Sequence, residues 1–427
     1  MKKACVFMFA AVAAATLNAA TINQVIVRQQ WPWSIKIKVE YSLSGVDASH
    51  PVDIAVSTFN GDDPLPSTNL RAAIEGNLYG ITEEFGEFYI DPVIAYGTEK
   101  IGMTKFKVKL AVSDSSANIG ETLYKIFDLT NGGCTDVTRR DLLNGKYGAV
   151  ETDFGRIGDG FNTTLSDVII WTGVTNYPGV KTTKLVMRKI PAKNVTWSMG
   201  ACDTDIAYGK TTSGQRHDVT LTKDYFMGVF PVTQRQYVLM TGFDNPSYFK
   251  NLAESDSRPV ETRKYNTVVT AVLPKIQAAT SVSEFTLPSE AQWEFACRAG
   301  ATNELNSGKT LTAAHAQEVA WCSDNANNET HPVGLLAPNA FGLYDMHGNV
   351  GEGCLDWFSS SESGYGDGSA VVDPTGPATD PSGSGERVTR GGYYTLQGGH
   401  YLIGSPGRNK HSGEYRTYGF RLAFVCE

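Results

Sequence analysis

The chain has few charged side chains and no excess of positive ones. Of its 427 residues, 19% are Asp, Glu, Lys or Arg, and the formal net charge is -8 at pH 7. An acidic chain is repelled by phosphates, so neither nucleic acid nor an anionic membrane is expected as a partner. The 43 glycines and the low share of charge are typical of a loop-rich, β-rich globular protein.

Paired-cysteine motifs are absent as well. No C-x-x-C spacing occurs, so a zinc ribbon or a thioredoxin-like redox motif has no support. Cysteines of an exported chain can form disulfides, but the sequence does not choose among their pairings. Six of them lie beyond the first twenty residues: Cys134, Cys202, Cys297, Cys322, Cys354 and Cys426.

A long apolar run occurs only at the start of the chain. Lys2 and Lys3 precede a mostly apolar stretch from Ala4 to Leu17, and small residues follow up to Ala20. This order predicts a secretory signal peptide over residues 1–20 and an exported protein, periplasmic or extracellular. The run is short for a membrane anchor, and no later stretch resembles a transmembrane helix. Loss of the two lysines would change the net charge from -8 to about -10.

Residues 21–190 predict a β-sandwich of the immunoglobulin-like kind. The segment SIKIKVEYSLSG (34–45) alternates apolar and polar residues, as a half-buried strand does. Short strands separated by polar turns favour a sandwich. Further strands are expected at 52–59, 87–97, 104–113, 123–132 and 182–190, and the apolar run 166–174 is expected to enter a core.

Residues 191–427 read as a second domain with short helices, which makes the fold class α+β. Thr233 and Gly242 predict the start and stop of one helix, and a second helix is expected over 267–279. Ser289 and Gln292 form a capping-box pattern at the start of a third helix. Strands are expected at 193–201, within 216–233, at 387–396 and at 418–426.

The stretch 338–358, PNAFGLYDMHGNVGEGCLDWF, is the centre of this second domain. It has a Gly348-Asn349 turn with Asp345 and Glu352 on either side, and it carries aromatics near its ends: Phe341, Tyr344, Trp357 and Phe358. Carboxylates and turn carbonyls at such spacing can surround one hard cation. The alternative is a solvated turn between two strands.

Nine stretches of residues 190–426, in order, resemble the formylglycine-generating enzyme family, also called sulfatase-modifying factors. They read SMGA, FPVTQRQY, NPSYF, RPVE, LPSEAQWEFACRAG, THPVG, PNAFGLYDMHGNVGE, RGGYY and GFRLAF. The resemblance implies a loop-rich fold similar to C-type lectins. The active members are copper-dependent oxidases that convert a substrate cysteine to formylglycine, and two cysteines after the R-G-G segment bind the copper.

The residues that the redox chemistry needs are replaced here. By the resemblance, the two cysteines would fall at Leu396 and Tyr401, and a serine would stand at Tyr393. Because thiolates are the ligands that suit Cu(I), copper is not expected, and no catalytic residue is assigned. His400 and His411 are alternative metal ligands, although lone histidines in polar loops are more often solvated. The H-x-x-x-H-x-E cluster of the related iron enzymes is absent.

The family also carries calcium near the G-N-V turn, and those positions are retained. The resemblance implies a structural Ca²⁺ site with carboxylate oxygens from Asp345 and Glu352 and carbonyl oxygens from Gly348 and Val350. Oxygen ligands at turn positions are what this ion requires.

Two functions follow from these observations. The first is a non-catalytic, exported binding or scaffold protein, with aromatics of GYYTLQGGHY (392–401) and SSSESGYGDG (359–368) lining a groove for peptide or glycan. The alternative is a divergent metal-dependent oxidoreductase that acts on a protein cysteine.

Overall fold

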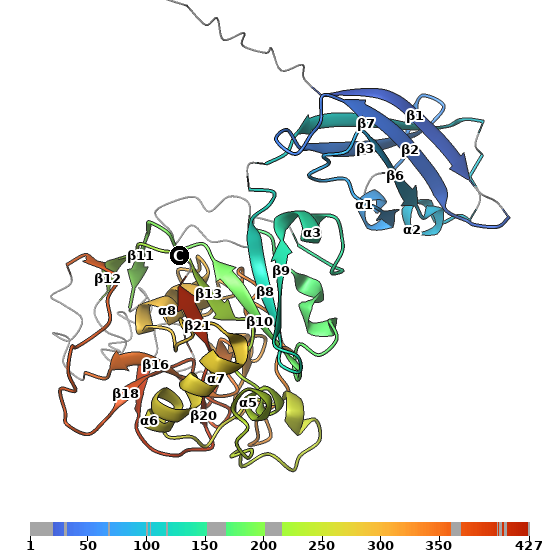
Figure 1. Ribbon diagram of the computed structural model, residues 1–427. Helices are drawn as coiled ribbons and strands as arrows, with labels where there is room; N and C mark the ends of the chain where they lie inside the picture. Colours follow the sequence, from blue (N-terminus) through green and yellow to red (C-terminus); the bar gives the residue numbers. More distant parts are fainter. Residues whose placement is uncertain are drawn as a thin grey trace, which may run out of the picture. The chain divides into compact units, whose positions relative to one another are not determined.

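The computed structural model separates the chain into two compact units, which we describe one at a time (Figure 1). The first unit comprises residues up to Glu121 together with Leu143–Lys146, and the second comprises the rest. The structure describes residues 20–29, 32–66, 69–99, 101–102, 104–116, 118–151, 168–200, 216–359, 369–398, 400, 404 and 408–425. The predicted signal peptide therefore lies outside the described residues, apart from Ala20.

The first unit consists of two antiparallel sheets around one core. One sheet has the strand order β1-β2-β6-β5 and the other β4-β3-β7. Alternate residues of β2 are buried, from Ile37 to Leu43, and they share a core with Ile54, Phe88 and Phe106 of other strands. The elements are β1 (Thr21–Gln29), β2 (Ile37–Ser44), β3 (Val52–Asn60), β4 (Asp63–Pro64), α1 (Leu70–Ala73), β5 (Ile74–Glu75), β6 (Phe85–Ile90), α2 (Pro92–Tyr96) and β7 (Phe106–Asp114).

The strand predicted over 87–97 is wrong in its second half. Strand β6 ends at Ile90, and α2 begins two residues later. The Asp91 carboxylate accepts hydrogen bonds from the backbone N–H groups of Val93 and Ile94, and Pro92 occupies the first helical turn. Proline at that position loses no helical hydrogen bond, so the local chemistry starts a helix here.

The second unit is sheet-rich with short helices. Its sheets have the orders β21-β13-β10-β8-β9, β19-β18-β16-β20, β11-β12-β17 and β14-β15. Its elements are β8 (Thr122–Asp128), β9 (Gly133–Thr138), α3 (Arg139–Leu143), η2 (Thr172–Asn176), β10 (Lys184–Ile190), β11 (Val195–Met199), β12 (His217–Leu221), β13 (Tyr225–Gly228), α5 (Gln234–Thr241), η4 (Ser255–Ser257), α6 (Tyr265–Thr267), η5 (Val268–Val272), α7 (Leu273–Thr280), α8 (Glu290–Arg298), α9 (Ala313–Ala316), β14 (Ala320–Trp321), β15 (His347–Gly348), β16 (Gly351–Trp357), β17 (Val371–Val372), β18 (Arg387–Arg390), β19 (Arg408–His411), β20 (Tyr418–Gly419) and β21 (Ala423–Val425).

The boundary between the units differs from the expected one at residue 190. Strands β8, β9 and β10 belong to the second unit, because β10 pairs with β13 from Met187 to Ile190 and with β8 along its other edge. The hydrogen bonds between β10 and β13 could not be seen in the sequence, where both sides of residue 190 are predicted to be short strands. The apolar run 166–174 does enter a core of this unit, with Ile170 and Trp171 buried.

Most predicted helices of the second unit are present. The Thr233 side chain caps α5, and Gly242 ends it in a left-handed conformation. The predicted helix 267–279 begins as α6, passes through one π-helical turn (η5) and continues as α7. Pro274 lies in the first turn of α7, and its missing N–H gives a physical reason for the change of helical register before it. Among the described residues, no helix is long and apolar enough to cross a bilayer.

Helix α8 is held at both ends by buried charges. Ser289 and Gln292 form the predicted capping box. The Asp356 carboxylate of β16 accepts a hydrogen bond of 2.7 Å from the Glu290 N–H. Arg390 of β18 bonds Glu290 at 2.8 Å and Glu294 at 2.8 Å. Burial, with the charge of Glu290 beside it, raises the pKa of Asp356 to about 7.

This raised pKa predicts a stability change with pH. An unfolded Asp has a pKa near 4, so between about pH 4 and pH 7 the folded state binds more protons at Asp356 than the unfolded state does. The free energy of unfolding should therefore fall as the pH rises through that window. Asp356→Asn cannot ionise, and it should gain stability relative to the parent by on the order of a few kcal/mol between pH 4 and pH 7. Urea unfolding at several pH values would measure the difference, and a pH-independent difference would contradict the prediction.

Candidate functional site

The G-N-V turn lies in the interior of the second unit. Every residue from Ala340 to Cys354 is buried, so the alternative of a solvated turn is wrong. Gly348 has φ of 69°, and a Cβ there would come within 2.2 Å of the Trp321 carbonyl oxygen. Only glycine allows β15 to approach β14 this closely. The aromatics of the stretch pack: Phe341 meets Phe295 at 5.8 Å between ring centroids.

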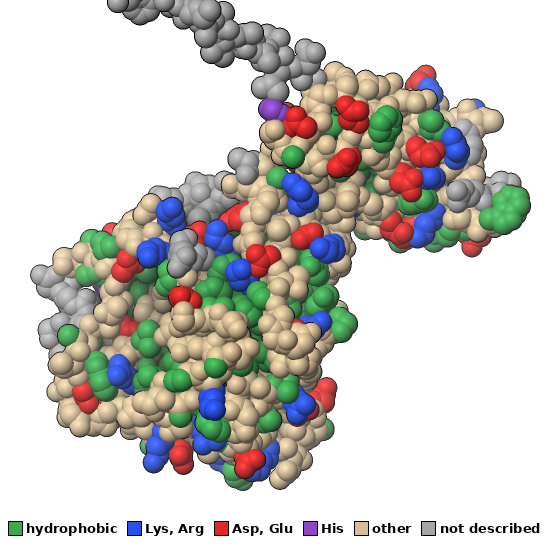
Figure 2. All heavy atoms as spheres, in the orientation of Figure 1, with side chains coloured by type: hydrophobic (Ala, Val, Ile, Leu, Met, Phe, Trp, Pro, Cys, Tyr) green, Lys and Arg blue, Asp and Glu red, His purple; other side chains and the backbone are tan. Residues whose placement is uncertain are grey.

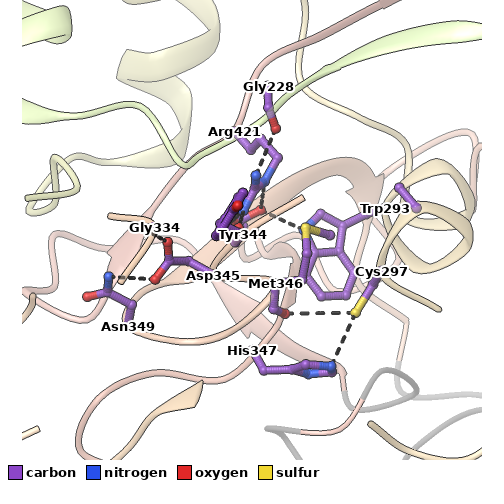
Figure 3. A network of polar contacts seen from close by, with 12 residues as sticks. Gly228, Trp293, Cys297, Gly334, Tyr344, Asp345, Met346, His347, Asn349 and Arg421 are labelled. Carbon is purple, nitrogen blue, oxygen red and sulfur yellow. Dashed lines mark hydrogen bonds and ion pairs between the residues drawn. The ribbon is translucent and has the colours of Figure 1, made fainter. Parts of the chain in front are cut away.

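Asp345 and Asn349 connect the G-N-V turn with the loop that contains His331 and Gly334 (Figure 3). The Asp345 carboxylate accepts a hydrogen bond of 2.7 Å from the Gly334 N–H and one of 3.2 Å from the Asn349 side-chain amide. That amide also donates to the His331 carbonyl, and its oxygen accepts from the His331 N–H, both at 3.0 Å. Burial raises the pKa of Asp345. The two side chains therefore hold the THPVG loop against the G-N-V turn.

Glu352 forms a fully buried ion pair with Arg421. Arg421 donates hydrogen bonds of 2.8–3.2 Å to the two carboxylate oxygens of Glu352. The Trp293 indole N–H donates another, of 2.7 Å, to the same carboxylate. The guanidinium also donates to the backbone carbonyls of Gly228 at 2.8 Å and Tyr344 at 2.7 Å (Figure 3). Arg421 and Glu352 are both 0% exposed. The pair thus joins β16, the segment before β21, α8 and β13.

These contacts bear on the predicted calcium site. The oxygens of Asp345 and Glu352 face hydrogen-bond donors, and the donor at Glu352 is itself a cation. A carboxylate so paired does not fit a Ca²⁺ ligand, because the ion would have to displace the guanidinium. Within the described ranges, no three His, Cys, Asp or Glu side chains are grouped as a metal site. Calcium at Asp345, Gly348, Val350 and Glu352 stays a prediction from the resemblance.

The position expected for the first copper-binding cysteine is occupied by a packed leucine. Leu396 is partly buried against Ala316, Ala320 and Cys322, and its carbonyl accepts from the Ser323 N–H at 2.8 Å. Tyr401, at the second position, lies outside the described residues.

The described cysteines do not replace the missing pair. No disulfide joins Cys134, Cys297, Cys322 and Cys354, and Cys202 and Cys426 lie outside the described residues. Cys297, Cys322 and Cys354 are 0% exposed, and burial raises the thiol pKa of Cys322 and Cys354. Thiols that stay protonated are poor metal ligands and poor nucleophiles.

His411 does not act as a replacement ligand in this arrangement. Its Nε2–H donates to the Gly413 carbonyl at 2.6 Å, and its ring lies 4.4 Å from that of Tyr418. Burial lowers its pKa to about 4. His400 is half-buried in the loop after β18, and its backbone N–H donates to the Gln397 carbonyl.

Aromatic side chains from three distant segments meet instead, and we call this group the tyrosine surface. It comprises Tyr248, Phe249, Tyr393, Tyr394, His411, Tyr415, Arg416 and Tyr418. Tyr248 is 64% exposed and Tyr415 is 53% exposed. The Arg416 guanidinium lies over the Tyr248 ring, 5.3 Å from its centroid.

Buried contacts hold the surface in place. Tyr393 packs edge-on against Tyr418, and Tyr394 against Phe249. The Glu261 carboxylate, 1% exposed, accepts from the N–H groups of Tyr248 and Phe249 at 3.0 and 3.2 Å. Beside it, residues including Tyr265, His411 and Tyr418 line a cavity of about 10 Å³, room for about one water. This cavity therefore has no room for a small-molecule ligand.

Only part of this surface was expected from the sequence. The segment 392–401 supplies Tyr393 and Tyr394, but Tyr248 and Tyr415 were not predicted. Tyr248 and Tyr415 lie far apart in the sequence, so no local sequence pattern could predict that they meet in the fold. Of the segment 359–368, only Ser359 is described, and it is buried.

The Glu352–Arg421 pair should dominate the stability of the second unit. Arg421→Met leaves a carboxylate buried beside a single indole N–H, and we expect a loss of about 3–5 kcal/mol in the free energy of unfolding. Lys309→Met removes an ion pair whose side chains are about half exposed, with a cost below about 1 kcal/mol. Urea unfolding of both variants tests this, and equal losses would contradict it. Glu352→Gln combined with Arg421→Met should recover part of the loss.

One of the relatives found by comparison carries the name of the family that the sequence resembles. A chaperone protein LppX from Paenibacillus barcinonensis is 28% identical over 205 residues, covering 36% of this chain and 70% of that protein. A formylglycine-generating enzyme from Thermomonospora curvata is 34% identical over 108 residues, covering 22% of this chain and only 34% of the enzyme. The solved structure of Treponema denticola variable protein 1 is 25% identical, with a TM-score of 0.48, and covers 57% of this chain and 96% of its own.

The family assignment itself rests on the length of the match. Residues 188–425, more than half of the chain, match the sulfatase-modifying factor enzyme 1-like domain. This range contains the turn, the buried ion pair and the tyrosine surface described above. The chain therefore belongs to the formylglycine-generating enzyme, or sulfatase-modifying factor, family.

Proposed function

We propose that this chain is an exported, non-catalytic binding protein that uses a C-type lectin-like domain of this family to present the tyrosine surface to a polypeptide. The observation that carries the proposal is the contrast between the intact buried contacts of the domain and the residue at the position where the family's copper ligand is expected. The buried contacts of Glu352 and Arg421 are complete, whereas a packed Leu396 stands where the redox chemistry needs a thiol. A domain that keeps its interior and lacks its soft metal ligands is suited to binding.

The composition of the tyrosine surface supports a macromolecular ligand. Tyrosine and arginine are the residues that contribute most at protein interfaces, because rigid rings bury much area at little entropic cost. Tyr248, Tyr415 and Arg416 are all exposed, and the cavity beside them is too small for a ligand larger than water. Exposed aromatic rings beside so small a cavity favour a polypeptide over a small molecule. A glycan is the second ligand class that such rings suit.

The first unit, in our proposal, is an immunoglobulin-like module. Its order β1-β2-β6-β5 corresponds to strands A-B-E-D of that fold, and β4-β3-β7 corresponds to C′-C-F. The next strand, β8, pairs within the second unit instead of continuing this sheet.

Arrays of peptides and glycans test the binding proposal. We expect the chain to retain a set of peptides, and Tyr415→Ala and Tyr248→Ala to weaken binding by at least about tenfold because each removes an exposed ring. Leu335→Ala is a matched control, since Leu335 is 54% exposed in the second unit outside the tyrosine surface. Retention of glycans alone, lost in Tyr415→Ala, would change the ligand class. Retention of nothing would contradict the proposal.

Metal analysis separates this function from the alternative oxidoreductase. We expect copper and iron well below one ion per chain and no O₂ consumption with a cysteine-containing peptide, because position 396 offers no thiolate. The calcium prediction is tested by measuring Tm with and without EGTA. Because Glu352 is already paired with Arg421, we expect no change in Tm when EGTA is added. Stoichiometric copper with O₂ uptake would replace our proposal by the alternative, and a fall in Tm of several degrees with EGTA would support the calcium site.

A further inference from the structure

One end of the first unit carries an exposed tryptophan beside an open cavity. The hairpin between β1 and β2 turns at this end, where Gln29 pairs with Ile37. The ends of β3 and β7 also lie here, with Asn60 opposite Phe106. The hydrogen bonds of Gln29 to the segment before β7 place both sheet ends together.

Trp33 projects from the hairpin and is 90% exposed. The backbone of the hairpin is held by Gln29, whose amide donates to the carbonyls of Ile35 at 2.8 Å and Glu99 at 2.9 Å. The amide oxygen of Gln29 accepts from the Ile101 N–H at 3.1 Å. One side chain thus fixes the base of the tryptophan hairpin against the segment that lines the cavity. A hairpin backbone that is already fixed loses little conformational entropy on binding, so the remaining cost is that of ordering the ring.

The cavity has a volume of about 290 Å³, which approaches the size of known small-ligand sites. Phe106 is buried at its base, and Leu65 and Ile101 are half-buried beside it. Three exposed residues complete the lining with an amide, a hydroxyl and an ammonium group: Asn60, Thr104 and Lys105. The cavity therefore joins an apolar base to a polar rim.

The charges around this end carry both signs, and two ion pairs lie near the cavity, whose lining holds one charged side chain, Lys105. Lys107 bonds Asp62 at 2.8 Å, and Lys36 bonds Glu75 at 2.5 Å. Acidic and basic side chains intermix on the face of the first unit that Figure 2 shows. The pairs leave little net field, and the field of the Lys105 ammonium is screened by salt because that side chain is exposed. The site therefore has only a weak electrostatic preference for an anion.

These properties select a class of ligand. A sugar ring has an apolar C–H face that packs on an aromatic ring and a rim of hydroxyls that need donors and acceptors. An acyl chain would leave the groups of Asn60 and Thr104 unpaired, and unpaired polar groups cost free energy on burial. We propose that this end of the first unit binds an uncharged sugar unit of a glycan, with Trp33 as the stacking platform and the cavity as the subsite beside it.

This site is separate from the tyrosine surface, so the two proposals fail independently. Glycan binding here predicts sensitivity to changes at Trp33 and none to changes at Tyr415.

The test uses the full chain on an array of neutral and acidic glycans, followed by calorimetry with the retained neutral glycan. Trp33→Ala should weaken binding by at least about tenfold, because it removes the stacking ring, and Trp33→Phe should restore part of it. Asn60→Ala should also weaken binding, because it removes hydrogen-bonding groups at the rim. Phe85→Ala is the matched control, since Phe85 is 75% exposed on the same unit but pairs with Ser42, near the other end of β2.

Neutral glycans should bind with an affinity that changes little between low and high salt. Retention of acidic glycans only, with affinity that falls steeply in salt, would overturn the assignment of an uncharged ligand. Unchanged binding in Trp33→Ala, or an equal loss in Phe85→Ala, would overturn the site. An array that retains no glycan would overturn the proposal while leaving peptide binding by the tyrosine surface untouched.

Discussion

The second unit depends on satisfying two charges that have been removed from water. Glu352 and Arg421 are 69 residues apart in the chain, and they meet with the Trp293 indole and two backbone carbonyls around them. A buried ion pair is tolerated only when nearly every donor and acceptor has a partner, because each unmet group carries its full desolvation cost. The strands and the helix that supply those partners are therefore constrained together.

A second buried network repeats this logic at helix α8. Arg390 bridges Glu290 and Glu294, and Arg298 joins Glu294 to the Gly200 backbone. Loop-rich domains have few long elements to order them, so side-chain networks of this kind supply specificity that helix and sheet contacts alone do not. With the interior held in this way, residues of the exposed loops can change without loss of the fold.

Local structure was predictable wherever the deciding atoms lie close in sequence. The caps of α5 and α8 follow from Thr233 and Ser289, each of which bonds a backbone N–H three residues on. Strand β2 follows from its alternation. The prediction went wrong at Asp91, where a cap and a proline ended a strand that periodicity alone extended. The pairing of β10 with β13, which brings β10 and its neighbour β8 into the second compact unit, is likewise invisible to a local pattern.

The sequence by itself determined the family, the acidic charge and the leucine at position 396, where the resemblance implies a cysteine, since each depends only on which residues are present and in what order. Tertiary structure decided which groups meet. It assigned Glu352 to a guanidinium rather than to a free cation site, and it gathered Tyr248, Tyr394 and Tyr415 into one surface. The physical reason is that hydrogen bonding and burial depend on distance in space, and residues far apart in sequence become neighbours only when the chain has folded.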